Sequence, residues 1–326
     1  MVKLSVLDLA NIGEGFTPAD ALRNALDLAQ HVEAAGYKRF WLAEHHNLAG
    51  IASAATSVCI CHVANGTKTI RVGAGGIMLP NHSPMVIAEQ FGTLATLFPD
   101  RIDLGLGRAP GTDQRTWQAL RRDPQASEYF PQDVVELQAL LGPPREGQTL
   151  HAIPGEDTNV PLWILGSSLF GAQLAAMLGL PYAFASHFAP QALMQAISVY
   201  RERFEPSAQL DKPYVMVGCN AIVAETEDAA KRLFTSPQQN FARMVRGTRG
   251  QLPPPVDDIE DYWSPMEKAQ SSSMLACSFY GAKETIKAKL EPLIAETGAD
   301  ELMVAAAIWD HKARARSFEL LAEAMG

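Results

Sequence analysis

The chain has 326 residues, of which 47% are apolar and 19% are charged, and its net charge is −9 at neutral pH. An apolar fraction of this size is ordinary for a globular protein and excludes a disordered chain. The acidic balance, with no Lys- or Arg-rich block, excludes a nucleic-acid backbone or an anionic membrane surface as an expected partner, and no apolar run approaches the length of a transmembrane helix.

The N-terminal segment and the cysteines indicate a cytoplasmic protein. The first residues lack the apolar core and the small-residue cleavage site of a signal peptide. The four cysteines, Cys59, Cys61, Cys219 and Cys277, do not show the spacing of a zinc site. We interpret them as small apolar side chains in a reducing compartment.

Apolar runs alternate with segments of helical periodicity along the whole chain. Eight runs are predicted as strands, at 4–9, 39–43, 70–78, 102–106, 162–165, 182–186, 214–223 and 301–308. Helices are predicted between them, at 19–35, 84–97, 132–141, 169–178, 190–204, 226–234, 282–297 and 312–324. The first helix has the clearest boundaries, because Thr17 can cap it and Pro18 suits its first turn.

This alternation predicts an α/β fold with a parallel sheet covered by helices. Eight strand–helix units match a (β/α)8 TIM barrel, with an open doubly wound sheet as the alternative. We expect residues 1–326 to form a single barrel domain with two insertions, at about 107–159 and 236–280. The second insertion lies between the seventh and eighth predicted strands, where we expect a mobile loop over the barrel mouth, with a solvated excursion as the alternative.

Polar residues and glycines recur at the carboxyl ends of the predicted strands, where such barrels place their active sites. In chain order these are Asp8, Glu44-His45-His46, Gly75-Gly76, Gly105-Leu106-Gly107-Arg108, Gly166-Ser167-Ser168 and Ser186-His187. We expect one histidine of the pair to point into the mouth as a proton donor or acceptor and the other to be structural. No metal site is expected, because neighbouring imidazoles at a strand end point to opposite faces.

Two further groups favour a phosphate-bearing, planar ligand. The paired glycines Gly75-Gly76 inside an apolar strand are typical of a close backbone approach to a ligand, or of a bulge. Arg108 suits bidentate recognition of a phosphate, and the helix start after Gly166, with Ser167 and Ser168, suits an anion, although ordinary serine capping is the alternative. Arg108 and this helix start follow neighbouring predicted strands, so they could together bind one phosphate monoester.

At this point the sequence resembles the bacterial luciferase-like flavin-dependent monooxygenases over nearly its whole length. The resemblance lies in the segments 40–47, 71–80 with His82 and Pro84, 100–108, and Gly166-Ser167-Ser168 with 178–181. It implies a (β/α)8 barrel that uses reduced FMN, commonly supplied by a separate NAD(P)H:flavin reductase, and O2 to oxygenate a small organic substrate, classically an aldehyde.

The resemblance also implies roles for individual residues. His45 matches the catalytic position, and Gly75-Gly76 matches a site where the family often has a non-proline cis peptide beneath the flavin. Arg108 and Ser167 match phosphate-contacting positions, and we include Asp8, Gly166 and Ser168 among the cofactor-binding candidates. Gly107 stands where luciferase has a reactive cysteine, so light emission is not expected.

The expected assembly is a homodimer. Two alternatives to the monooxygenase stay open, namely a non-catalytic flavin-binding protein and an F420-dependent oxidoreductase on the same fold.

Overall fold

The computed structural model describes residues 2–109, 113–123 and 125–326. Within these residues, nine strands form one parallel sheet: β1 (Lys3–Asp8), β2 (Arg39–Leu42), β3 (Arg71–Met78), β4 (Ile102–Gly107), β5 (Leu162–Gly166), β6 (Tyr182–Phe184), β7 (Val215–Ala224), β8 (Ser278–Ala282) and β9 (Glu301–Ala305). The sheet closes on itself, because β6 pairs with β7, β7 with β9, and β9 with β1. The predicted (β/α)8 barrel is therefore confirmed.

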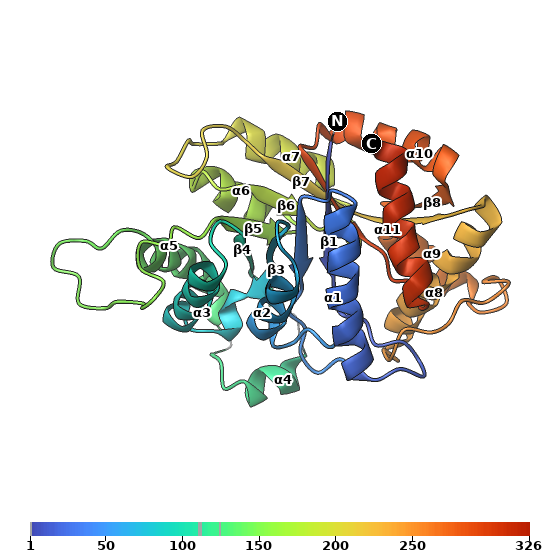
Figure 1. The fold of residues 1–326 in the computed structure, drawn as a ribbon, viewed down its shortest axis with the longest axis horizontal. Helices are drawn as coiled ribbons and strands as arrows, with labels where there is room; N and C mark the ends of the chain where they lie inside the picture. Colours follow the sequence, from blue (N-terminus) through green and yellow to red (C-terminus); the bar gives the residue numbers. More distant parts are fainter. Residues whose placement is uncertain (1, 110–112, 124) are drawn as a thin grey trace.

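Helices surround the barrel (Figure 1). They are α1 (Pro18–Ala34), α2 (Thr56–Gly66), α3 (Pro84–Leu97), α4 (Gln114–Ala119), α5 (Phe130–Leu141), α6 (Leu169–Met177), α7 (Leu193–Glu202), α8 (Glu227–Arg246), α9 (Pro265–Met274), α10 (Lys283–Thr297) and α11 (His311–Met325), with short 3-10 turns at η1 (Leu79–Asn81) and η2 (Ala126–Glu128). The expected start of α1 is confirmed, because Thr17 and Asp20 form a capping box. No helix in the described part of the chain combines the length and the apolar character needed to cross a bilayer.

The sequence does not predict the strand β8, which lies mostly within the second insertion. It pairs with the carboxyl half of β7, from Asn220 to Ala224, whereas β9 pairs with the amino half. Residues 236–280 thus hold the end of α8, all of α9 and most of β8. The insertion thus contains helices and a strand, and its mobility stays a prediction.

The barrel interior is filled by large side chains that face glycines. Trp41 and Trp163 meet edge to face with ring centroids 5.1 Å apart. A Cβ added to Gly75 would lie 2.8 Å from Leu7 Cδ1 and 3.0 Å from Trp41 Cε3. Glycine at this inward position of β3 is therefore required by the bulk of Trp41 and Leu7.

The amino end of the barrel is polar and charged. Arg39 donates to Glu301 (Nε to Oε1, 2.7 Å) and to Asp103 (Nη1 to Oδ2, 2.7 Å), and all three side chains are buried. Arg71 also binds Asp103, at 2.6 Å from Nη2 to Oδ1. Since barrel active sites lie at the opposite end, we interpret this network as structural.

Candidate functional site

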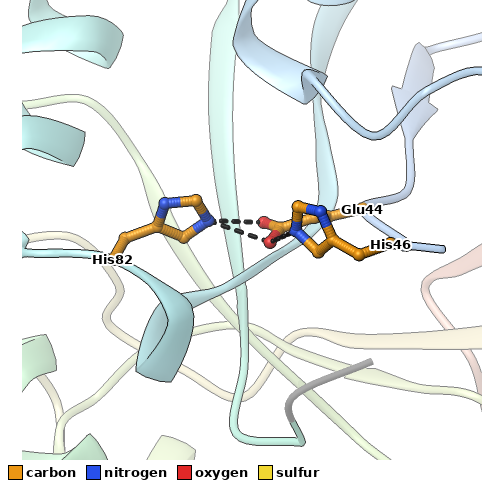
Figure 2. A group of neighbouring side chains, drawn as sticks. All are labelled: Glu44, His46 and His82. Carbon is orange, nitrogen blue, oxygen red and sulfur yellow. Dashed lines mark hydrogen bonds and ion pairs between the residues drawn. The ribbon is translucent and has the colours of Figure 1, made fainter. Parts of the chain in front are cut away.

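The carboxylate of Glu44 is the centre of a hydrogen-bonded cluster just beyond β2. It accepts hydrogen bonds from His46 Nε2 at 2.7 Å and from His82 Nε2 at 2.9 Å, as Figure 2 shows. The amide of Asn81 and the backbone N–H of Met78 donate to the same carboxylate at 3.1 and 3.0 Å. The cluster therefore ties the segment after β2 to the end of β3 and to η1.

The protonation of this cluster follows from its contacts. Burial alone would raise the pKa of Glu44, but the hydrogen bonds from His46 and His82 outweigh it and hold the pKa at about 2. The hydrogen bond to Glu44 in turn raises the pKa of His46 above its ordinary value, against partial burial. Glu44 is thus an anion under ordinary conditions, and His46 is stabilised as a cation.

Glu44, His46 and His82 also form a group that could hold a metal ion, since their ligand atoms lie within 4.8 Å of one another. A carboxylate and two imidazoles are suitable ligands for several divalent metals. The distances of 2.7 and 2.9 Å from the imidazole nitrogens to the Glu44 carboxylate are those of charge-assisted hydrogen bonds. The Met78 N–H and the Asn81 amide donate to the same carboxylate. The sequence pattern places His45 and His46 together, whereas His82, 38 residues after Glu44, is brought to the site only by the fold.

His45 lies next to this cluster and within electrostatic range of a second histidine. It is half-buried and precedes His46, whose side chain is held by Glu44. Charge on His45 contributes to lowering the pKa of His187, which follows β6, so the two imidazoles lie close enough to interact. The structural part of the expectation fits His46, which Glu44 holds, whereas the direction of His45 into the mouth and its catalytic role stay predictions.

Arg108 and the start of α6 come together, as the sequence suggested. The Arg108 guanidinium carbon lies 4.1 Å from the centroid of the Phe170 ring, and Phe170 is in the first turn of α6. Ser168, at the N-cap of α6, makes no side-chain capping hydrogen bond. Arg108 thus contacts a side chain of the first turn of α6, whose first N–H groups have no partner within the helix.

Neighbouring protein atoms explain the glycine at Gly76 but not the one at Gly166. A Cβ on Gly76 would lie 2.7 Å from Gly105 O, so protein backbone alone requires glycine there. At Gly166 the nearest atoms would be 3.7 and 3.8 Å away, so neighbouring protein does not require it. The peptide bond between Gly75 and Gly76 is cis, which confirms that expectation.

Asp8 does not join the other candidates. Its side chain is fully buried, accepts a hydrogen bond from Ala10 N at 2.9 Å and pairs with Arg314 of α11 at 2.5 Å. The neighbours Ser5 and Leu7 face the barrel interior, whereas Asp8 faces the layer between the strands and the helices. Its geometry gives no support to the predicted role in cofactor binding.

The second insertion borders the mouth. Leu252 exchanges backbone hydrogen bonds with the loop after β1, from Leu252 N to Ile12 O and from Glu14 N to Leu252 O, both at 2.9 Å. Arg243 of α8 reaches Glu14 at 2.6 Å. A Cβ on Gly50 would lie 2.2 Å from Gly250 O, so the two backbones are in close contact. These contacts hold the segment against the loops that follow β1 and β2.

Comparison with known proteins agrees with this architecture. A family model described as luciferase-like monooxygenase matches residues 2–313. A luciferase-like monooxygenase of Escherichia coli (strain K12) is 53% identical over 320 residues, covering 98% of this chain and 96% of the relative. An uncharacterised Bacillus subtilis protein, YvbT, is 53% identical over 321 residues with the same coverage. The crystal structure of apo-MsnO8 is similar with a TM-score of 0.93 and 36% identity, covering 100% and 98% of the two chains.

More distant structures share the fold alone. The oxygenating constituent of 3,6-diketocamphane monooxygenase from Pseudomonas putida, solved with FMN, is 15% identical with a TM-score of 0.72. An F420-dependent secondary alcohol dehydrogenase is 14% identical with a TM-score of 0.71. The family model and the close relatives span almost the entire sequence, and the chain therefore belongs to the luciferase-like monooxygenase family.

Proposed function

We propose that this protein is an FMN-dependent monooxygenase that uses reduced FMN and O2 to oxygenate a small organic substrate, an aldehyde in the first instance. The observation that carries this proposal is the contact between Arg108 and the first turn of α6. A guanidinium that contacts the first turn of a helix with an uncapped N-terminus suits a phosphate monoester, the terminal group of FMN.

The residues present fit such a cofactor. Arg108, Ser167 and Ser168 would hold the phosphate, and Gly166 would allow it to approach the backbone because no Cβ occupies that space. Gly75 and Gly76 would lie along the planar ring. Bound reduced FMN would supply the electrons that activate O2, since side chains do not perform this chemistry themselves. His45 would donate or accept the proton at the substrate oxygen.

Other cofactors and roles make distinguishable predictions. F420-dependent enzymes share this fold. A non-catalytic flavin-binding protein would bind FMN without consuming O2. The Glu44 cluster and His45 favour catalysis, because a carrier has no need of titratable groups at its mouth.

The remaining proposals concern partners and location. We propose a flavin reductase as the source of reduced FMN, and a homodimer as the assembly. The exposed apolar side chains Val58 of α2 and Val86 and Leu97 of α3 support a partner surface on these helices. All four cysteines are free, which suits a reducing cytoplasm.

The test compares ligands that differ only in the phosphate. We expect the protein to bind FMN more tightly than riboflavin, and Arg108→Gln to weaken FMN binding by roughly 10- to 100-fold, because hydrogen bonds to charged groups are lost. Riboflavin affinity should stay unchanged, and Arg145→Gln, at an exposed arginine outside the site, is the matched control. Fluorescence titration measures all of these affinities.

Turnover completes the test. Oxygen consumption with reduced FMN should rise on adding decanal and should yield the oxygenated product. Tighter binding of F420 than of FMN, or FMN binding without substrate-dependent oxygen consumption, would instead select one of the two alternatives.

A further inference from the structure

The imidazole of His187 lies at the barrel mouth without the hydrogen bonds that buried polar groups normally make. Its Nδ1 atom is buried and has no hydrogen-bond partner among residues 2–109, 113–123 and 125–326. Most buried polar atoms in folded proteins do have a partner, in the protein or in a bound molecule. A buried ring nitrogen without one at this end of the barrel indicates that a bound molecule completes the site.

The ring is held by packing and by its backbone. The Asn220 side chain of β7 donates to the carbonyl oxygen of His187 at 2.6 Å and also contacts Ser278 Oγ of β8 at 2.9 Å. A Cβ on Gly218 of β7 would lie 2.6 Å from His187 Nδ1, so the ring occupies the space that a side chain there would fill. The Phe188 ring meets it edge to face at 5.0 Å. The ring is therefore held in place, while its Nδ1 atom has no hydrogen-bond partner in the part of the chain that the structure describes.

The electrostatic surroundings keep this imidazole uncharged. Burial, and secondarily the charge on His45, lower the pKa of His187 to about 4. Without a positive charge, the imidazole has no electrostatic preference for an anion, and it can donate or accept a hydrogen bond with an uncharged oxygen. Its chemistry differs from that of Arg108, which suits an anion.

The position in the barrel separates His187 from the proposed cofactor site. The order of the strands places β2 and β6 on opposite sides of the ring, with β3, β4 and β5 between them on one side. Arg108 and the start of α6 follow β4 and β5, and the paired glycines lie on β3. A cofactor held by these groups would use the β3–β5 side and leave the segments after β2 and β6, which carry His45 and His187, for the second ligand.

We propose that the His187 imidazole binds the uncharged carbonyl oxygen of the organic substrate, opposite His45. The proposal rests on the proposed function for the identity of the reaction, but the carbonyl site itself does not depend on which cofactor is bound. His187 is thus a substrate-binding residue, and Asn220 and Gly218 are the residues that position it.

The first experiment observes the imidazole directly. In protein labelled with 15N-histidine, the His187 ring nitrogens are assigned by their loss in His187→Gln. The unreactive ketone 2-decanone is added, with and without oxidised FMN. We expect the His187 ring nitrogens to shift with 2-decanone and to respond less to decanoate, which is an anion. Absence of a response to the ketone in both conditions, or an equal response to decanoate, overturns the proposal.

The second experiment separates substrate from cofactor. We expect His187→Phe, which keeps a ring of similar size, to raise the KM for decanal about five- to tenfold, the effect of one hydrogen bond. His187→Gln should restore part of this loss, FMN affinity should be unchanged in both variants, and His62→Phe on the exposed face of α2 is the control.

The two experiments fail in different ways. Loss of FMN affinity in His187→Phe with an unchanged KM would assign His187 to the cofactor and overturn the proposal. A wild-type protein that binds 2-decanone at His187 but does not oxygenate decanal would disprove the proposed function and leave the carbonyl site standing.

Discussion

A single carboxylate, Glu44, organises the polar part of the barrel mouth. Four donors from three segments converge on it, and its own exposed fraction is only 1%. Removing the charge would leave these donors facing a neutral group in a desolvated place, where unpaired polar groups are costly. Glu44 thus positions His46 and the η1 turn, and through them the neighbouring His45.

We expect Glu44→Gln to lower the free energy of unfolding by about 2 kcal/mol, the loss of hydrogen bonds to a charged group. The pKa of His46 should fall toward its ordinary value, because the bond to Glu44 is the first cause of its rise. Urea unfolding and histidine NMR titration measure the two effects, and Glu146→Gln, at an exposed glutamate, is the control. Equal stability of the two variants would contradict the central role of Glu44. Metal analysis of both proteins shows in addition whether the cluster binds an ion.

The same residue predicts a pH dependence. The folded pKa of Glu44, about 2, is below the ordinary value of 4.5, so its contribution to stability is present above pH 4.5 and is lost as the pH falls toward 2. His46 has a raised pKa and contributes stability below its ordinary value of 6.5, which is lost as the pH rises through the folded pKa. The stability of the wild type should therefore fall more steeply than that of Glu44→Gln between pH 4.5 and 2.

At the scale of elements, the mouth depends on close contacts between loops from distant parts of the chain. The segment after α8 runs beside the loop after β1, with Gly13 and Leu252 forming an isolated parallel bridge. A small apolar cluster within this insertion, Ala242, Ile259 and Trp263, gives it a core of its own. The insertion is therefore an ordered unit that borders the mouth through a few backbone contacts, and such units open at a lower free energy than the whole fold.

We expect Gly50→Ala to displace this segment from the mouth, because its Cβ would lie 2.2 Å from Gly250 O. Hydrogen exchange at the amides of Glu14 and Leu252 should become faster, while exchange in the barrel strands stays the same. Gly250→Ala is the matched control, since a Cβ there meets nothing within 4 Å. Equal exchange rates in the two variants would show that the contact does not hold the segment.

At the scale of the whole molecule, the two ends of the barrel carry different groups of polar residues. The amino end carries the buried network of Arg39, Asp103 and Glu301, and the carboxyl end carries the candidate site. Burial of charges is tolerated at the amino end because each carboxylate is paired and hydrogen-bonded. Changes at the two ends should therefore have different consequences.

We expect Arg39→Met to lower the free energy of unfolding by about 3–5 kcal/mol, because two buried carboxylates lose their shared cation. The FMN affinity and the KM of the folded protein should be unchanged. Urea unfolding also tests whether residues 1–326 form a single domain, for which we expect one cooperative transition. Arg203→Met, at an exposed arginine, is the control, and a changed KM in Arg39→Met alone would show that the two ends are coupled.

The sequence by itself determined the barrel. Its eight predicted strands correspond to the eight that close the ring, because apolar runs of this length between helical segments have few other ways to be buried. It does not predict the helices α2, α4 and α9 or the strand β8. Length does not explain the missed strand, because β8 has five residues whereas the predicted β2 and β6 have four and three. Instead, β8 pairs only with the carboxyl half of β7, a distant segment that local pattern does not reveal.

The tertiary structure alone decided which polar residues meet. Glu44 and His82 are 38 residues apart, and His45 and His187 come within electrostatic range only because β2 and β6 belong to one closed ring. The sequence also does not show where the side chain of Asp8 points. A strand buried on both faces has no alternation of apolar and polar residues from which inward and outward positions could be assigned. Strand ends are local properties of the sequence, whereas the partners of a side chain at a strand end are set by the register and closure of the whole sheet.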